Sequence, residues 1–494
     1  MSVGRKAGKG FVSYLFRSLL EKVMGVIAMI FLARKLTPYD FGLVSITEVL
    51  LTLISVIGTT GLAEFLLAYR KNDTEEIFKA AFWFNLIITL GIVVLFFGAI
   101  PFWLVWQHDE KIRNISWIVG GIFVFSQLQT IPKTWFSKNL MFDTQVRIQA
   151  PFIILVSLTK ILAVFMGLGV YSLIIPTLLF QPILTFVLYF NTNIRPSLKL
   201  YLNRWKEIYH FTKHLIGATI FSRITDQGDK FILAKFLGLE SLGVYNLACQ
   251  LAELVTSQVV QISGGVVSSI LPKYVHDKEL FYKHYITFLK TLSFFILPLL
   301  GILFITAKPT IELLYGNQWQ AAVLPLQIMI VAAAFRAVSS SYGSVMNSFH
   351  LNKKSFIVTV VYAPFHLAAS AIGSMFGVVG LATGVAIVKT IFTNWNIKQL
   401  MDAMSVKVIN WYKDVAPYFL TTVSIGILIS VLYKLCDISL LKPMYSIIVI
   451  GSIFILLYIV VFRTIYKSKT QEIATFMNIA FPSLSPIFNK VFGT

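Results

Sequence analysis

The sequence predicts an all-α polytopic membrane protein with about fourteen transmembrane helices. Of its 494 residues, 57% are hydrophobic and only 13% are charged, and the mean hydropathy is +0.77. This composition is typical of a chain that crosses a membrane many times and is unlike that of a soluble protein. The apolar runs are about 20 residues long, the length of a membrane-spanning helix and about twice that of a β-barrel strand.

The apolar segments follow one another with short polar connections. The longest internal connection, 191–210, is basic, and we expect it to be partly a surface helix. Each apolar segment is long enough to cross the hydrocarbon core as a helix. In chain order we expect spans at 11–33, 41–68, 79–105, 114–135, 147–167, 171–190, 211–237, 241–271, 284–306, 321–346, 355–376, 378–400, 414–433 and 443–463.

Lysine and arginine outside the spans predict the orientation. With the N-terminus inside, about 27 of the 42 basic residues lie on the cytoplasmic side and about 8 on the opposite side. The remainder lie within spans. We therefore expect both termini in the cytoplasm, and the same bias accounts for most of the net charge of +20. The basic loops thus serve as topology signals, with contacts to anionic lipid as a secondary expectation.

An internal repeat divides the chain near residue 200. Residues 31–43 (FLARKLTPYDFGL) align with 232–244 (ILAKFLGLESLGV) at an offset of 201 residues, and the same offset aligns Lys22 with Arg223. Six spans then recur as six spans in the same orientation, as in transporters whose halves are related by a pseudo-two-fold axis along the membrane normal. We expect one six-helix lobe with its cytoplasmic linker at 1–200, a second lobe at 201–405, and two extra helices with a cytoplasmic tail at 406–494.

The seventh span carries an unusual set of polar residues. On a helix, Arg223, Asp226, Gln227 and Lys230 share about a third of the circumference, and Asp229 lies outside that arc. Charges within a membrane cost several kcal/mol and normally face a protein interior or a wet cavity. We interpret this face as the wall of a substrate cavity. The alternative is a self-neutralising structural cluster of residues spaced three and four apart.

Further cations lie within other spans of both halves. Arg17 can pair with Glu21 one turn away, whereas Lys160, Arg336 and Lys389 have no acid in their own spans. An unpaired buried cation needs a distant partner, an interface to snorkel to, or an anionic ligand. Arginine presents a planar fork that suits phosphate oxygens. The substrate-binding candidates are Arg17, Lys22, Arg223, Lys230, Arg336 and Lys389.

The acids within spans are candidates for coupling transport to protons or sodium ions. Asp226, Glu48 and Glu253 are the residues we select. The alternative for the glutamates is structural, with each pairing with Arg17, Lys22 or Arg223. Prolines within spans, such as Pro101, Pro132, Pro151, Pro182, Pro298 and Pro364, predict bends, although proline is common in membrane helices.

The sequence lacks the signatures of soluble catalytic sites. It contains no nucleotide-binding glycine loop, no His-Glu-x-x-His motif and no CxxC pair, and its two cysteines, Cys249 and Cys436, provide no metal site. We therefore expect a transporter, not an enzyme, with no cofactor and no bound ATP.

The start of the chain resembles a known family. Residues 33–44, which read ARKLTPYDFGLV, are similar to the corresponding segment of bacterial polysaccharide repeat-unit flippases of the Wzx type. These belong to the multidrug/oligosaccharidyl-lipid/polysaccharide exporter superfamily. Span count, repeat and charge placement extend the resemblance over most of the chain.

The resemblance implies a fold and a cargo. It implies two six-helix lobes plus two helices, and movement of undecaprenyl-pyrophosphate-linked oligosaccharide across the bacterial inner membrane by alternating access, for surface polysaccharide biosynthesis. A cationic cavity would hold the pyrophosphate or acidic sugars, with Arg17, Lys22, Arg223 and Arg336 as the matching residues. The last two spans resemble the pair that forms a lipid-tail groove in related lipid II flippases.

The same resemblance implies partners and leaves alternatives. The partners are the lipid-linked oligosaccharide, membrane lipid, a proton or sodium gradient and other polysaccharide-assembly proteins, and not nucleic acid. The alternatives are a lipid II flippase, a cation-coupled antiporter of the same superfamily, and a polytopic polysaccharide polymerase or glycosyltransferase. The short outer loops and the internal repeat favour transport over the enzyme.

Overall fold

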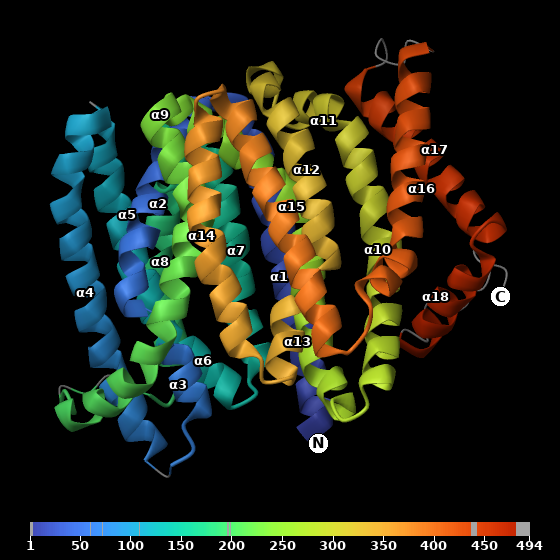
Figure 1. Ribbon diagram of the computed structural model, residues 1–494. Coiled ribbons are helices and arrows are strands. Elements are labelled where there is room, and N and C mark those ends of the chain that lie inside the picture. The colour runs from blue at the N-terminus through green and yellow to red at the C-terminus, as the bar shows by residue number, and fades with distance from the viewer. Residues whose placement is uncertain are drawn as a thin grey trace. The chain divides into compact units, whose positions relative to one another are not determined.

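A computed structural model describes residues 3–59, 61–71, 73–107, 109–194, 197, 199–435 and 442–480 (Figure 1). Within these ranges the regular elements are helices, and no strand is present. This confirms the all-α fold class. The chain forms two compact units, Met1–Asn246 and Leu247–Thr494.

Unit 1 consists of long helices joined by tight connections. The helix pairs α1 and α7, α4 and α5, and α2 and α4 pack along one another. The elements are α1 Val3–Lys35, α2 Pro38–Thr59, α3 Leu62–Ala68, α4 Thr74–Gln107, α5 Lys111–Leu128, α6 Thr130–Lys138, α7 Phe142–Phe165, η1 Gly169–Leu173, α8 Ile175–Phe190 and the first part of α9 Leu202–Ile270.

Unit 2 begins within α9 and also consists of long helices joined by tight connections. The pair α14 and α15 lies side by side in orange in Figure 1, and α16 packs against both α10 and α17. The elements are η2 Leu271–Tyr274, α10 Lys278–Ile305, α11 Ala307–Leu314, η3 Asn317–Ala322, α12 Val323–Val338, α13 Tyr342–Ser348, α14 Asn352–Ser374, α15 Gly377–Ala403, α16 Val408–Leu435, α17 Pro443–Thr464 and α18 Lys467–Ala480.

The described residues contain 12 helical segments that are long and apolar enough to cross a membrane. One of them, Thr219–Ser257, contains Gly238, whose φ of 82° and ψ of 179° interrupt α9. This segment therefore holds two of the expected spans. The expected span 11–33 lies in α1, which is not among the 12 segments. The expected span 41–68 is also divided, because α2 ends at Thr59 and α3 begins at Leu62 after Gly61, whose φ is 86°. The observed segments otherwise follow the expected order.

The two copies of the repeat motif contact each other reciprocally in unit 1. A Cβ on Gly42 would lie 1.9 Å from the Leu239 carbonyl oxygen, and a Cβ on Gly243 would lie 1.9 Å from the Pro38 carbonyl oxygen. Each contact becomes the other when its residues are shifted by the repeat offset. Asn246 donates a hydrogen bond of 2.7 Å to Ser45 across the same offset of 201. The local two-fold axis therefore passes between α2 and the second segment of α9.

Two equivalent spans of the repeat are broken near their ends. The fourth span divides into α5 and α6 at Gln129, and the tenth divides into α12 and α13 around Ser339. Pro132 explains the first break, because its ring clashes with the carbonyl four residues earlier. At the second, a run of serines competes for backbone groups, and the Ser339 hydroxyl bonds to the Arg336 carbonyl at 3.3 Å.

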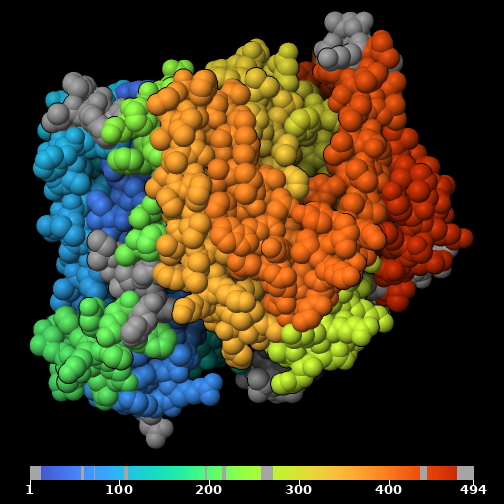
Figure 2. All heavy atoms as spheres, viewed as in Figure 1, coloured from blue at the N-terminus to red at the C-terminus, as the bar shows by residue number. Residues whose placement is uncertain are grey.

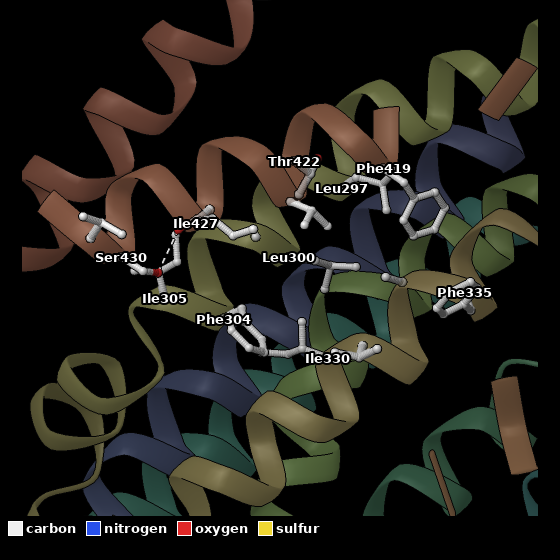
Figure 3. A pocket seen from close by; sticks show the side chains of 16 residues that line it. Leu297, Leu300, Phe304, Ile305, Ile330, Phe335, Phe419, Thr422, Ile427 and Ser430 are labelled. Atoms are coloured by element: carbon white, nitrogen blue, oxygen red, sulfur yellow. Dashed lines mark hydrogen bonds between the residues drawn. The ribbon is translucent and has the colours of Figure 1, made fainter. Parts of the chain in front are cut away.

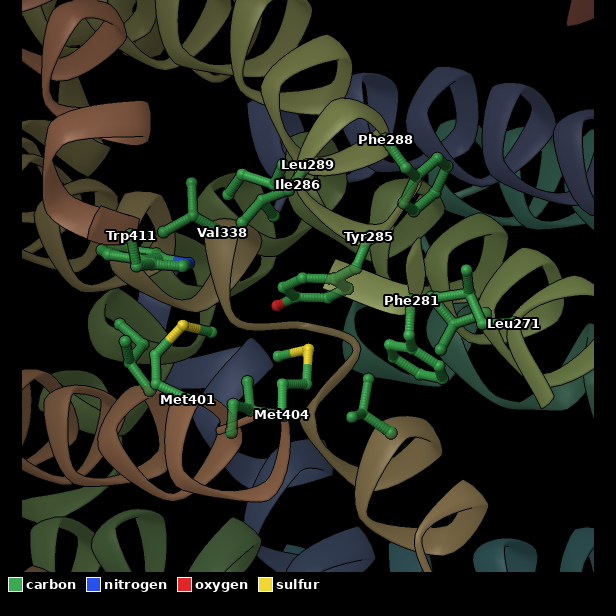
Figure 4. Packing of buried hydrophobic residues seen from close by; sticks show 14 of the residues in the cluster. Leu271, Phe281, Tyr285, Ile286, Phe288, Leu289, Val338, Met401, Met404 and Trp411 are labelled. Atoms are coloured by element: carbon green, nitrogen blue, oxygen red, sulfur yellow. The ribbon is translucent and has the colours of Figure 1, made fainter. Parts of the chain in front are cut away.

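Apolar cores hold the ends of the spans within each unit. In unit 2, Tyr285 and Phe281 of α10 pack with Met401 and Met404 beside Trp411 of α16 (Figure 4). In unit 1, a second cluster gathers α3, α4 and α6 around residues such as Phe65, Phe78 and Ile131, all of them buried. These clusters fix the helix ends, and the charged side chains lie farther along the spans.

Ion pairs hold the start of α9 against the connection between α3 and α4 and the first turn of α4. Arg204 forms ion pairs with Asp73 and, at 2.8 Å, with Glu76, and Lys71 pairs with Glu207 at 2.7 Å. The hydrogen bond from Tyr69 and the nearby Arg204 lower the pKa of Asp73. As expected, the segment between the sixth and seventh spans is thus partly a helix, residues 202–210, held against the preceding loop.

Candidate functional site

In unit 1, helices α1 and α7 end, α2 begins and α9 is interrupted at about the same depth along the helix axes. We name this depth the turn end. There α1 ends at Lys35 and α2 begins at Pro38. The Lys35 ammonium lies 5.6 Å from the ring centroid of Phe165, at the end of α7. The contact of Gly243 with Pro38 brings the break of α9 to the same level. Depth along the spans can therefore be counted from the turn end, at about 1.5 Å per helical residue.

The first polar level joins Glu48 to two lysines, about 8–15 Å from the turn end. Glu48 lies on α2, Lys160 on α7 and Lys230 on α9, and the carboxylate interacts electrostatically with both ammonium groups. The Glu48 side chain is exposed although it stands well inside the span. A charged group that is both deep in a helical lobe and accessible lines a wet space.

The second polar level lies about 16–21 Å from the turn end. Lys22 of α1 is half-buried, and Arg223 of α9 is exposed. These two residues are equivalent under the repeat, and their equal depth agrees with that relation. Asp226 is exposed one turn nearer the turn end, whereas Asp229 is buried and accepts a hydrogen bond of 2.7 Å from Tyr245. The expected polar arc therefore matches the accessible side of this helix.

The third polar level, about 27 Å from the turn end, surrounds Arg17. The guanidinium donates from Nη1 to Oε1 of Gln149 at 2.8 Å, and Nη2 lies 3.8 Å from Glu21. Gln149 is 3% exposed and stands on α7, so it fixes the orientation of the arginine. Lys133 of α6 interacts electrostatically with both Arg17 and Glu21.

Unit 2 holds the remaining candidates. Arg336, in the last turn of α12 beside the break of the tenth span, pairs with Glu253 of α9 at 3.2 Å, and each side chain is 55% exposed. The distant partner expected for Arg336 is therefore Glu253. Lys389 of α15 is half-buried, and within the described ranges it forms no ion pair.

An apolar pocket of about 500 Å³ lies in unit 2 between α10, α12 and α16 (Figure 3). Leu300 and Phe304 line it from α10, Ile330 from α12, and Phe419 from α16. Thr422 and Ser430 supply its hydroxyl groups, and Ser430 donates to the backbone at 2.7 Å. In Figure 2 the surface is hollowed between the yellow helices and orange-red α16. The pocket suits a hydrocarbon chain better than a polar ligand.

Sequence reasoning missed two lysines, the half-buried Lys133 and the buried Lys290. Lys133 stands near the end of the expected span 114–135, where a lysine counts as a topology signal. Lys290 stands near the start of the ninth span and pairs with Asp414 at 3.0 Å and with Glu472 at 3.1 Å. Pro132, next to Lys133, was a signal that the end of the fourth span is irregular and can place a lysine in the interior.

No group of three or more potential metal ligands is found among the residues that the structure describes.

The comparison with protein families identifies the chain. The model of a family described as polysaccharide biosynthesis protein matches residues 31–324. The chain belongs to this family. Within the polysaccharide biosynthesis family, an uncharacterised membrane protein in the cps region of Klebsiella pneumoniae is 26% identical over 403 residues, 79% of this chain and 81% of that protein. The succinoglycan biosynthesis transport protein ExoT of Rhizobium meliloti is 24% identical over 322 residues, 63% of each chain.

A solved structure shows how this member of the family is folded. The lipid II flippase MurJ, in an inward closed conformation, superposes with a TM-score of 0.72 at 14% identity and covers 92% of this chain and 99% of its own. At this identity the likeness concerns the fold. The chain is thus a multi-pass membrane protein of polysaccharide biosynthesis with the fold of a lipid flippase.

Proposed function

We propose that the protein moves a lipid-linked oligosaccharide repeat unit, carried on undecaprenyl pyrophosphate, from the cytoplasmic to the outer leaflet of the bacterial inner membrane. The observation that carries the proposal is the row of cations at successive depths on the spans of unit 1, in a chain of the polysaccharide biosynthesis family. Charged residues at such depths in a membrane protein face its interior or a water-filled cavity and mark substrate or ion pathways.

The cations bind the anionic part of the cargo. Arg17, Lys22, Arg223 and Lys230 of unit 1, with Arg336 and Lys389 of unit 2, supply charge-assisted hydrogen bonds to pyrophosphate or acidic sugar oxygens. The spacing of the unit 1 cations along their spans lets the anion pass from one of them to the next. The polyprenyl tail occupies the apolar pocket between α10, α12 and α16, whose lining is almost wholly hydrocarbon.

The proposal also covers the orientation of the protein in the membrane and the gradient that drives transport. Both termini lie in the cytoplasm, which puts the turn end of unit 1 on the outer side. The two lobes, 1–200 and 201–405, alternate the access of the cargo, with 406–494 attached to the second lobe. Asp226, Glu48 and Glu253 couple the movement to a proton or sodium gradient. Other polysaccharide-assembly proteins deliver and receive the cargo.

Cargo transfer in liposomes tests the function directly. The purified chain is reconstituted with fluorescent undecaprenyl-pyrophosphate oligosaccharide in one leaflet, and its arrival in the other is followed with and without a proton or sodium gradient. We expect transfer that depends on the protein, and the effective gradient names the coupling ion. If folded protein transfers none of several oligosaccharides, the proposal is wrong.

Single substitutions test the role of the cations. Arg336→Ala breaks an ion pair whose partners are both about half exposed, so folding should lose less than about 1 kcal/mol. We expect this variant and Arg223→Ala to lose export of the repeat unit while the amount of folded membrane protein is unchanged, and Lys at either position to restore export in part. Lys308→Ala, which breaks an exposed pair with Glu312, is the matched control. Wild-type export in both Ala variants would refute cation binding.

A further inference from the structure

Arg17 is held by a neutral partner and is incompletely satisfied. Its Nη1 donates to Gln149, while its Nε is buried and has no hydrogen-bond partner within the described ranges. The Glu21 carboxylate is 3.8 Å from Nη2, beyond hydrogen-bond distance, and its side chain is 60% exposed. A guanidinium that is oriented by an amide and only loosely neutralised retains donors for another anion.

The break of the fourth span brings a second cation to this place. The span breaks at Gln129, Pro132 lies in the first turn of α6, and Lys133 follows it directly. The helix α6 packs against α7, which carries Gln149 and lies along α1. Lys133 is half-buried and interacts with Arg17 by repulsion and with Glu21 by attraction. Two cations therefore share one exposed carboxylate.

The neighbouring acid does not neutralise the pair. Asp143 of α7 lies one turn farther along the same seam and accepts a hydrogen bond from Ser13 of α1. Among the ion pairs of the described residues, Glu21 is the carboxylate that faces Arg17, and it also attracts Lys133. The site keeps an excess positive charge within a membrane lobe, which favours a bound anion.

We propose that Arg17 and Lys133 form a phosphoryl-binding subsite in unit 1, with Gln149 as a positioning residue. Glu21 is the internal counter-ion, and an arriving phosphoryl group displaces it. The buried Nε and the adjacent Nη2 bind two phosphoryl oxygens in the fork geometry of arginine, and the Lys133 ammonium binds a third. This inference rests on the proposed function, because the phosphoryl group is that of the lipid-linked cargo at the end of unit 1 opposite the turn end.

Binding of farnesyl pyrophosphate separates the role of the Lys133 cation from that of the Glu21 counter-ion. The full-length protein in detergent is titrated with farnesyl pyrophosphate by calorimetry. We expect Lys133→Met to weaken binding about tenfold, as for the loss of one charge-assisted contact. We expect Glu21→Gln to tighten binding several-fold, because the competing internal anion is gone. A merely structural ion pair predicts no gain from Glu21→Gln.

Controls separate this subsite from general effects of charge and folding. Lys206→Met, at an exposed lysine of α9, should bind as the wild type does. Lys133→Arg should retain most of the affinity, and thermal unfolding of each variant verifies folding. Inorganic pyrophosphate should compete with the probe, whereas phosphatidylglycerol should not. Equal competition by phosphatidylglycerol would assign the site to bulk lipid and overturn the proposal.

The outcomes also distinguish the subsite from the function. If the wild type transfers oligosaccharide in liposomes and Lys133→Met binds and transfers equally well, the subsite is wrong and the function stands. If the wild type binds farnesyl pyrophosphate through Lys133 but transfers no oligosaccharide, the subsite stands as a phosphoryl site and the function is wrong.

Discussion

Glu48 shows how charges in unit 1 find partners across helices. Its carboxylate is shared between Lys160 and Lys230, which stand on two other helices. Removing one member of such a set leaves the others poorly compensated, and an uncompensated charge in a membrane lobe costs more than the pair contributes. The stability of unit 1 therefore depends on the charge balance of Glu48, Lys160 and Lys230, whether or not Glu48 takes part in coupling.

We predict that Glu48→Gln lowers the unfolding temperature of the detergent-solubilised protein by several degrees, because two ammonium groups lose their counter-ion. Adding Lys160→Met should restore part of the loss, which a double-mutant cycle by thermal unfolding measures. Strictly additive effects of the two substitutions would contradict the shared set. Lys235→Met, an exposed lysine beside the turn end, is the control.

Sequence reasoning located charged residues within the spans but identified few of their partners. The Arg17–Glu21 pair follows from spacing along one helix, and the structure confirms it at 3.8 Å. The partner of Arg336 is Glu253, 83 residues away, and no local pattern points to it. Lys160, for which the sequence left a distant partner, an interface or a ligand open, interacts with Glu48 of α2. Pairing between helices depends on packing, which periodicity within one helix does not specify.

At the scale of elements, α18 is attached to the spans of unit 2 through charge. Lys290 of α10, which is 8% exposed, pairs with Asp414 of α16 and Glu472 of α18. Burial and the neighbouring Lys290 lower the pKa of Lys469, also on α18, whose ammonium lies 3.3 Å from a carbonyl oxygen of α16. The helices α10 and α16 also line the apolar pocket, so α18 braces the walls of that pocket.

We predict that Lys290→Met destabilises unit 2 by about 1–3 kcal/mol, because the partly exposed carboxylates of Asp414 and Glu472 lose their charge-assisted contacts with the buried cation. Hydrogen exchange in α18 should rise more than exchange in α14. Lys283→Met, at an exposed lysine on the same helix, should change neither. Unchanged protection of α18 in the Lys290 variant would show that apolar contacts alone hold this helix.

The elements themselves were largely predictable from hydropathy. The order of the spans, the interruption near residue 238 and the break beside Pro132 all have local signals in the sequence. The break around Ser339 has weaker ones, since serines bend membrane helices only in some contexts. Prolines such as Pro151 and Pro298 lie within helices that continue through them, so a proline alone does not decide where a span is broken.

At the scale of the whole molecule, the repeat has a physical centre. Gly42 and Gly243 each admit a backbone carbonyl of the other copy at a distance that no side chain tolerates. Small residues let membrane helices approach in this way. The alignment predicted equivalent positions, but it did not predict that these positions touch each other, because equivalence does not reveal where the axis lies.

We predict that Gly42→Ala and Gly243→Ala each destabilise the protein by about 1–3 kcal/mol, since the new Cβ forces α2 and α9 apart. The double variant should lose less than the sum, because one separation relieves both contacts. Gly98→Ala, where the added Cβ meets no neighbour, should leave the unfolding temperature unchanged or raised. Full additivity of the two losses would indicate that the two contacts are independent.

The reciprocal glycine contact has a consequence for how the chain could be divided. Because each copy of the motif carries both the glycine and the carbonyl that the other copy needs, a single copy holds every surface of the contact. A half-length protein with one motif would thus already possess a self-complementary interface. Two identical halves joined as a homodimer would reproduce the arrangement that this chain builds by covalent duplication.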